Sequence, residues 1–198
     1  MVDVNPQGRR STSGAPGRPM NQIVIRRCGV VATGLLALIA IALGAWPLHV
    51  LLIEDMQHPR TVFVRPVQPG HRLSIGFLHS VEHCRVWDHL TIGPDFEMVV
   101  TATEFAESRT GLPYAAFGEE VFERRGDHFR IGNMQRPVPE IYQWVDARYE
   151  NTLRINGGED IRLASLAGNT LLHMHIACMP VVRWGWLKAT LYWQHRSS

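Results

Sequence analysis

The stretch Leu73-Ser-Ile-Gly-Phe-Leu-His-Ser-Val81 decides the expected fold of this chain. Every second residue of it, from Leu73 to Val81, falls on one face of an extended backbone. Small or polar residues fill most of the positions between them, which is the period-2 pattern of a half-buried β-strand. Helical periodicity is weak across residues 60–178. The sequence therefore predicts a mainly β domain.

Further short β-rich runs stand on both sides of this stretch, separated by turn residues. Gly126-Asp127 and Asn156-Gly157-Gly158 each lie between two such runs and predict hairpin turns. Strands this short and this closely spaced favour a small antiparallel β-sandwich or open barrel. The expected strands are Thr61–Val64, Val86–Ile92, Glu97–Phe105, the Val121–Ile131 hairpin, Ile141–Val145, Leu153–Ile155, Ile161–Leu163 and Leu171–Cys178.

An apolar run precedes the predicted domain. No Asp, Glu, Lys or Arg occurs from Cys28 to Ile53, and the run up to Trp46 is almost purely apolar. As a helix, that run spans ~28 Å, close to the hydrocarbon thickness of a bilayer. We predict one transmembrane helix over residues 28–53, with Pro47 breaking or kinking it. A cleaved signal peptide is the alternative, and it stays open.

Charges on either side of the apolar run set the expected topology. Five arginines and one acid, Asp3, precede it, whereas Glu54 and Asp55 follow it. The positive-inside rule then puts the N-terminus in the cytoplasm and the domain on the other side. Residues 1–27 have little apolar content and are expected to form a disordered basic tail. Residues 54–179 are expected to form the extracytoplasmic β domain.

The last segment, residues 180–198, mixes aromatic side chains with cations. Such a mixture is typical of a membrane interface, and Trp46 falls at the far edge of the apolar run. A last strand or helix that packs on the core is an equally good interpretation, and docking of a partner protein is a third. The residues expected at a membrane or partner interface are Trp46, Trp184, Trp186, Tyr192 and Trp193.

Composition excludes several classes of function. The net charge is only +2, so no strong basic field points to nucleic acid. No CxxC, G-x-S-x-G, phosphate-loop or dinucleotide pattern is present. We therefore expect no enzyme activity, no metal and no cofactor. Whether Cys84 and Cys178 form a disulfide is left open.

One string with chemical meaning is His79-Ser-Val-Glu-His83, an H-x-x-E-H pattern. A zinc site of that type needs both histidines on one turn of a helix, whereas on a strand they lie ~13 Å apart. A zinc hydrolase through His79, Glu82 and His83 is therefore only an alternative. Two weaker ideas are a metal held by His173 and His175 with His79 or His89, and an acid–base pair of Glu82 with Glu104.

Four short motifs resemble a known family. They are Ile75-Gly-Phe-Leu with His79-Ser-Val-Glu82, then Thr103-Glu-Phe105, then Thr110-Gly-Leu-Pro113. Over residues 60–178 the chain resembles the domain of unknown function numbered 1850, small bacterial proteins often encoded beside TRAP transporters of the TAXI type. Glu107-Ser-Arg109 stands where the family usually has small residues, and the aromatic tail is also a departure.

The resemblance implies an extracytoplasmic β domain on an anchor in the bacterial inner membrane, with no established enzyme activity. Carried over residue by residue, it marks His79, Glu82, Glu104, Gly111 and Pro113 as a binding site of unassigned role. We expect a non-catalytic accessory or scaffold subunit of an integral membrane complex, in contact with the lipid bilayer. That complex is a TRAP-type transporter by resemblance, or a respiratory or photosynthetic assembly. A membrane-tethered module that binds a solute or a metal is the alternative.

Overall fold

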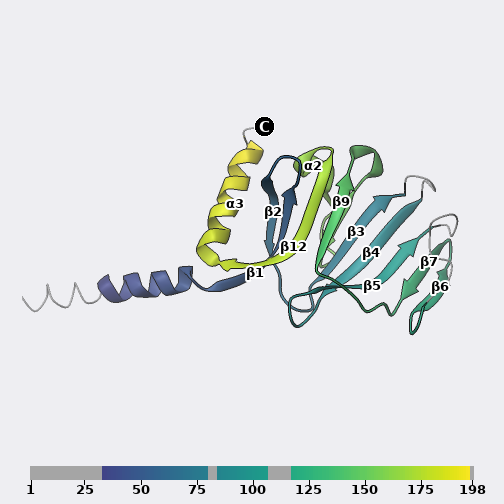
Figure 1. The fold of residues 1–198 in the computed structure, drawn as a ribbon, viewed down its shortest axis with the longest axis horizontal. Helices are drawn as coiled ribbons and strands as arrows, with labels where there is room; N and C mark the ends of the chain where they lie inside the picture. Colours follow the sequence, from purple (N-terminus) through teal and green to yellow (C-terminus); the bar gives the residue numbers. More distant parts are fainter. Residues whose placement is uncertain (1–32, 80–83, 107–116, 197–198) are drawn as a thin grey trace, which may run out of the picture. The chain divides into compact units, whose positions relative to one another are not determined.

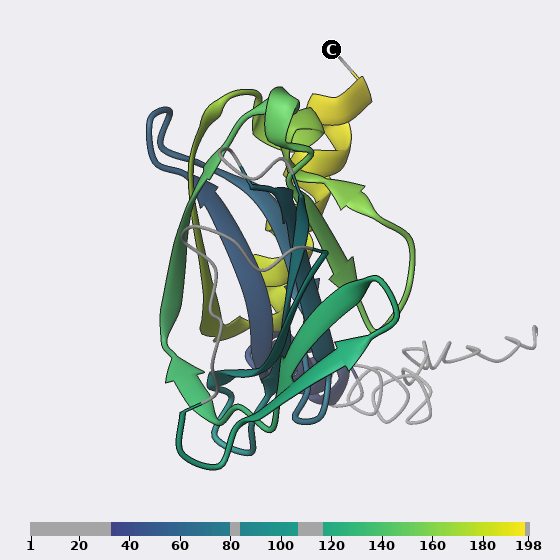
Figure 2. The same ribbon diagram turned by 90° about the vertical axis from the view of Figure 1, so that its right-hand side faces the viewer.

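The structure is a computed structural model that describes residues 33–79, 84–106 and 117–196. In these residues two antiparallel sheets pack face to face (Figures 1 and 2). The first sheet has four strands in the order β2-β1-β12-β9. Its strands are β1 (Pro47–Asp55), β2 (Arg60–Pro66), β9 (Glu140–Val145) and β12 (Thr170–Pro180).

The second sheet of the described chain has eight strands. Seven follow the order β11-β10-β3-β4-β5-β7-β6, and β8 pairs with β5. Their bounds are β3 (Arg72–Leu78), β4 (Arg85–Ile92), β5 (Met98–Phe105), β6 (Val121–Arg125), β7 (His128–Gly132), β8 (Arg136–Val138), β10 (Thr152–Ile155) and β11 (Ile161–Arg162).

Two short helices, η1 (Ala147–Tyr149) and α2 (Leu163–Ala167), and the longer α3 (Val181–Arg196) also belong to the domain. Helix α3 lies on the side of the first sheet that faces away from the second sheet (Figure 1). Its Trp184 and Leu187 pack on an apolar cluster of Val50, Leu52 and Met179. The first sheet is therefore covered on both faces, by the second sheet on one and by α3 over part of the other.

The main core lies between the two sheets. Leu51, Ile53, Leu172 and Met174 come from the first sheet and are at most 1 % exposed. Period-2 alternation directs these side chains to one face, while their neighbours along each strand point outward. The second sheet contributes Leu73, Ile75, Leu90, Ile92, Met98, Leu153 and Ile155.

The predicted mainly β, antiparallel fold is confirmed. The stretch from Leu73 forms β3, and the Gly126-Asp127 turn joins β6 to β7. The loop at Asn156-Gly157 joins β10 to β11, with Gly157 at a φ of 70° that favours glycine. In that loop Asn156 accepts a hydrogen bond from Arg72 N at 2.8 Å, which ties the hairpin to β3.

The extension of the predicted helix to Ile53 is wrong, because Pro47–Asp55 is strand β1. Leu51 and Ile53 face the second sheet, whereas Val50 and Leu52 face α3. A strand buried on both faces is apolar at every position, so its sequence looks the same as a stretch of buried helix. Pro47 fits this boundary, since proline lacks the N–H that a continuing helix needs.

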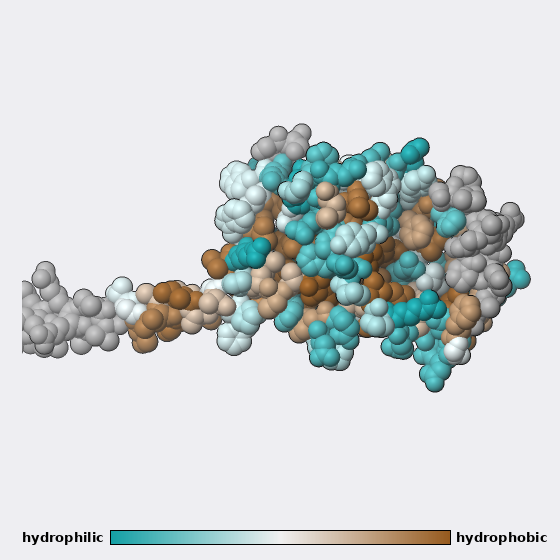
Figure 3. Space-filling model, in the orientation of Figure 1, coloured by the Kyte–Doolittle hydropathy of each residue, from teal (hydrophilic) through white to brown (hydrophobic). Residues whose placement is uncertain are grey.

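Residues 33–44 are helical, and 33–43 belong to a unit separate from the domain that begins at Gly44. The large side chains of this helix are exposed, and its apolar surface is coloured brown in Figure 3. In the described part of the chain, no helix has the length and apolar character needed to cross a membrane. The predicted tail 1–27 and residues 28–32 of the predicted span lie outside the described residues.

The two cysteines of the domain are free thiols in the structure. Cys84 is buried beside Val86 and Phe105 in a small apolar cluster of the second sheet. Cys178 is exposed on β12 of the first sheet. The structure therefore does not contain the disulfide that the sequence left open.

Candidate functional site

A cavity of about 550 Å³ lies between the two sheets. Strands β3, β4, β5, β8 and β9 line it, together with Tyr149 and Asn151 beyond β9. Ile75, Phe77 and Leu90 form part of an apolar wall. Cavities of roughly 300–1,000 Å³ that are mainly apolar with a few polar groups are the usual form of small-molecule sites.

One carboxyl group interrupts the apolar wall. On β4, residues Val86, Asp88, Leu90 and Ile92 share the face toward the other sheet, so Asp88 occupies a position that the pattern gives to an apolar residue. Its carboxylate accepts a hydrogen bond from Thr103 Oγ1 at 2.7 Å. Burial raises the pKa of Asp88, and the Thr103 hydroxyl and nearby His89 offset this only in part. A carboxyl with a raised pKa in a cavity is a typical feature of a functional site.

A second polar group lines the same cavity. Gln143 lies between Ile141 and Val145 on β9, and its Oε1 is buried with no hydrogen-bond partner among the described residues. An unpaired buried acceptor costs about 1–3 kcal/mol, and a bound donor relieves that cost. Asp88 and Gln143 together make the cavity suited to a ligand with an apolar body and at least one hydrogen-bond donor.

His79 brings the sequence motif to this cavity. It follows the end of β3, lines the cavity, and donates its backbone N–H to Cys84 O at 2.8 Å. Glu82 and His83, and with them most of the H-x-x-E-H string, lie outside the described residues. Gly111 and Pro113 lie outside them as well.

Glu104 lies elsewhere, on the outer face of the second sheet. It accepts a charge-assisted hydrogen bond from Arg130, and His89 Nε2 lies 3.4 Å from its carboxylate. Burial alone would raise the pKa of Glu104, but Arg130 and His89 hold it below its usual value. His89 Nδ1 is in turn hydrogen-bonded to Ser74 Oγ at 2.9 Å. The structure therefore does not bring Glu104 into the cavity with His79, and the predicted grouping of the two is not formed.

The predicted interface aromatics divide into two groups. Trp184 packs inward on the sheet, as the interpretation of a helix packing on the core requires. The other four are exposed by between 56 and 67 %: Trp46, Trp186, Tyr192 and Trp193.

His173 and His175 also lie away from the residues considered as their partners. They are on the outer face of the first sheet, whereas His79 lines the cavity and His89 is on the second sheet. Glu54 of β1 and Glu140 of β9 are acidic residues beside them. No local pattern in the sequence pointed to Glu54, because the proximity depends on pairing β1 with a strand more than 100 residues away.

Residues 73–163 match the model of a family described as Domain of unknown function (DUF1850). The match supports the family resemblance drawn from the motifs. All the cavity-lining residues fall within the DUF1850 match, whereas β1, β12 and α3 lie outside it. No curated protein and no solved structure matches the chain.

Proposed function

We propose that this chain is a membrane-tethered, non-catalytic binding protein. It holds a small amphipathic solute in the cavity between its sheets. The observation that carries the proposal is the cavity itself, which has apolar walls and a partly buried carboxyl at Asp88. The apolar walls take the body of the solute, and its donor group pairs with Asp88 or Gln143.

The preferred ligand class follows from the sign of the groups in the cavity. The Asp88 carboxylate and Gln143 Oε1 are acceptors. An anion meets only repulsion from Asp88, whereas an amine or a hydroxyl donates to it. An ammonium group also stabilises the ionised carboxylate that burial disfavours. We therefore favour an amphipathic amine or alcohol over an acid.

The apolar run and its flanking charges are the evidence for the proposed membrane tether. Exposed apolar side chains cover the helical residues 33–44, and the run continues upstream to Cys28. Arginines precede the run and acids follow it, which favours a domain on the extracytoplasmic side of a bacterial inner membrane. The exposed large side chains of this helix are Leu35, Leu36, Leu38, Ile39, Ile41 and Leu43.

A second candidate function is that of an accessory subunit of an integral membrane complex. Val182, Trp186 and Trp193 recur at helical spacing on α3 and are exposed by 66 or 67 % each. An exposed aromatic stripe of this kind is suited to a partner or a membrane interface. The family resemblance makes a TRAP-type transporter the first partner to test, and a respiratory or photosynthetic complex the next.

Purification of the full-length chain in mild detergent tests both candidates. Organic extraction and mass spectrometry are expected to identify a bound amphipathic solute. Returning that solute is expected to raise Tm, because a ligand at 100 times its Kd stabilises the folded state by about 2.7 kcal/mol. Co-purification of a multi-helix membrane protein, lost on substituting Trp186 and Trp193 by alanine, would establish the accessory subunit.

Two variants give the matched control. Val100→Phe fills the cavity and is expected to abolish solute binding. Val99→Phe makes the same change on the opposite face of β5 and is expected to leave binding intact. Wild-type protein that yields no solute, or equal binding in the two variants, contradicts the proposal.

A further inference from the structure

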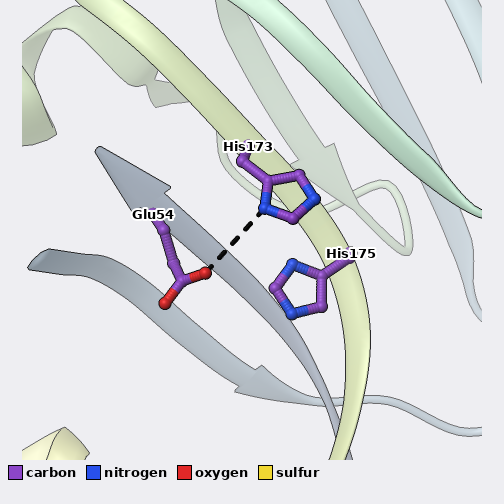
Figure 4. Close-up of side chains that lie close together, drawn as sticks. All are labelled: Glu54, His173 and His175. Atoms are coloured by element: carbon purple, nitrogen blue, oxygen red, sulfur yellow. Dashed lines mark ion pairs between the residues drawn. The ribbon is translucent and has the colours of Figure 1, made fainter. Parts of the chain in front are cut away.

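Three metal-ligating side chains converge on the outer face of the first sheet. They are Glu54 of β1 and His173 and His175 of β12, and each offers one ligand atom within 4.8 Å of the other two (Figure 4). Antiparallel pairing of the two strands places Glu54 directly across from His173. Leu172 and Met174 fill the core, so the two histidines necessarily share the opposite face.

The hydrogen bonds around His173 fix which nitrogen faces the other two residues. Its Nε2 lies 2.9 Å from Glu140 Oε2 on β9. Since an ionised carboxylate only accepts, Nε2 must carry the proton and donate it. In the neutral ring, Nδ1 then presents its lone pair toward Glu54, whose Oε2 lies 3.9 Å away. A carboxylate that orients a histidine through its far nitrogen is the usual outer partner of a metal-bound imidazole.

The second histidine also presents an unused nitrogen. His175 Nδ1 is buried and has no hydrogen-bond partner among the described residues. Burial lowers the pKa of His175, and the neighbouring His173 lowers it further, against the opposing effect of Glu54 and Glu140. Burial thus favours the neutral ring, which is the form of histidine that binds metal.

Stacking fixes the planes of the rings. His173 stacks on Tyr142 with centroids 4.5 Å apart, and on His175 with centroids 4.4 Å apart. The imidazole lone pairs lie in these two nearly parallel ring planes, and one nitrogen of each ring lies within 4.8 Å of the other and of a Glu54 carboxylate oxygen. Coordination of one ion requires a ring to rotate out of this stack, so that both nitrogens and the Glu54 oxygen lie ~2.0–2.2 Å from a Zn²⁺.

We propose that Glu54, His173 and His175 bind a divalent transition-metal ion, with Glu140 orienting His173 from outside the coordination shell. Imidazole nitrogens with one carboxylate suit late first-row metals such as Zn²⁺ and Cu²⁺ better than Mg²⁺ or Ca²⁺. The three proposed ligands lie outside the family match, whereas Glu140 lies within it. None of these four residues lines the cavity, although Tyr142, which stacks on His173, does. Because no proposed metal ligand lines the cavity, separate variants test metal binding and solute binding.

Calorimetric titration of the full-length, EDTA-treated chain with Zn²⁺ tests the proposal, in protein without a polyhistidine tag. We expect one ion per chain with Kd below about 1 µM. His175→Gln and Glu54→Gln are each expected to weaken binding at least 100-fold. Glu140→Gln is expected to weaken it by about 10–100-fold, as loss of an outer carboxylate does.

His128 supplies the matched control, because its Nδ1 also lies beside a carboxylate, Asp127, at 3.1 Å, but on an exposed hairpin. His128→Gln is expected to leave Zn²⁺ affinity unchanged. If His175→Gln does not fold, Glu54→Gln and Glu140→Gln still decide the question, since both side chains are partly exposed. Absence of stoichiometric binding in the wild type would overturn the proposal. So would equal affinity in the wild type and the Glu54→Gln variant.

Discussion

Substitution of Asp88 by asparagine is expected to stabilise the protein at pH 7 by about 1–2 kcal/mol. The asparagine side chain keeps the hydrogen bond from Thr103, although a bond to a neutral acceptor is worth about 1 kcal/mol less than one to a carboxylate. The variant no longer buries a charge, and the effective cost of burying one ion is several kcal/mol. The hydrogen bond from Thr103 offsets only part of this cost, so the ionised Asp88 side chain lowers the stability of the wild-type protein.

Asp55 gives the opposite case and serves as the matched control. Its buried Oδ1 accepts hydrogen bonds from Gln57 N, His58 N and Thr170 Oγ1, at distances of 3.0, 3.2 and 2.5 Å. Asp55→Asn weakens three bonds by about 1 kcal/mol each, so the loss of stability is about 2–3 kcal/mol. The two identical substitutions should therefore change stability in opposite directions.

The pH dependence separates the two carboxyls further. Burial raises the pKa of Asp88 above its ordinary 3.8, so its contribution to stability is complete below pH 3.8 and is lost as pH rises through the folded pKa. For Asp55, burial opposes but the Thr170 and backbone hydrogen bonds prevail, and the pKa is lowered. Its contribution is complete above pH 3.8 and is lost as pH falls through the folded pKa. The extra stability of the Asp88→Asn variant should therefore disappear at acidic pH.

Urea unfolding of the full-length chain in detergent, followed by tryptophan fluorescence between pH 3 and 8, measures both effects. The expected result is a more stable Asp88→Asn variant at pH 7 and equality with the wild type near pH 3. An Asp88→Asn variant that is destabilised at pH 7 by as much as Asp55→Asn would refute this reasoning. It would mean that donors fully compensate the Asp88 carboxylate for its burial, as they do that of Asp55.

Three further predictions concern packing and the thiols. Gly76→Ala should lower stability by about 1–3 kcal/mol, because the added Cβ would lie 2.8 Å from ring atoms of Trp87. Leu172→Ala should cost about 2–5 kcal/mol, since this side chain is 0 % exposed in the core between the sheets. Urea unfolding measures the loss of stability in both variants. Cys178, which is exposed, should react with a maleimide in the folded protein, whereas buried Cys84 should react only on unfolding.

Each of these has a control on the same chain. Gly132→Ala adds the same methyl group 3.6 Å from its nearest neighbour and should cost less than Gly76→Ala. Val121→Ala removes a side chain that is 46 % exposed and should change stability by about 0.5 kcal/mol or less. The thiol measurement needs a Cys28→Ser background, so that two cysteines remain. Equal costs within either pair, or equal rates for the two thiols, would contradict the packing described.

Most of the fold could be predicted from local sequence patterns. The strand from Leu73 and the turns at Gly126 and Asn156 each depend on residues next to one another in the chain, so alternation and turn chemistry sufficed to find them. The prediction for the residues of β1 was wrong because this strand is apolar on both faces, one covered by α3 and the other by the second sheet. That coverage is a property of the tertiary structure.

The sites were harder to predict than the strands. Asp88 stands in phase with Val86 and Leu90, and this parity was visible in the sequence, but nothing local showed that the strand borders a cavity. The meeting of Glu54 with His173 depends on the register of two strands far apart in the chain. Of the residues marked by the family resemblance, His79 lines the cavity and Glu104 does not.

Native mass spectrometry of the full-length chain, released from detergent micelles, tests the central claim most directly. The account predicts a second mass peak, heavier than the apo chain by one small solute, in the wild type and in Val99→Phe. It predicts that this peak is absent from Val100→Phe, in which the cavity is filled. Detection of the wild-type chain only at its own mass would contradict a solute site between the sheets. So would a bound solute that persists in the Val100→Phe variant.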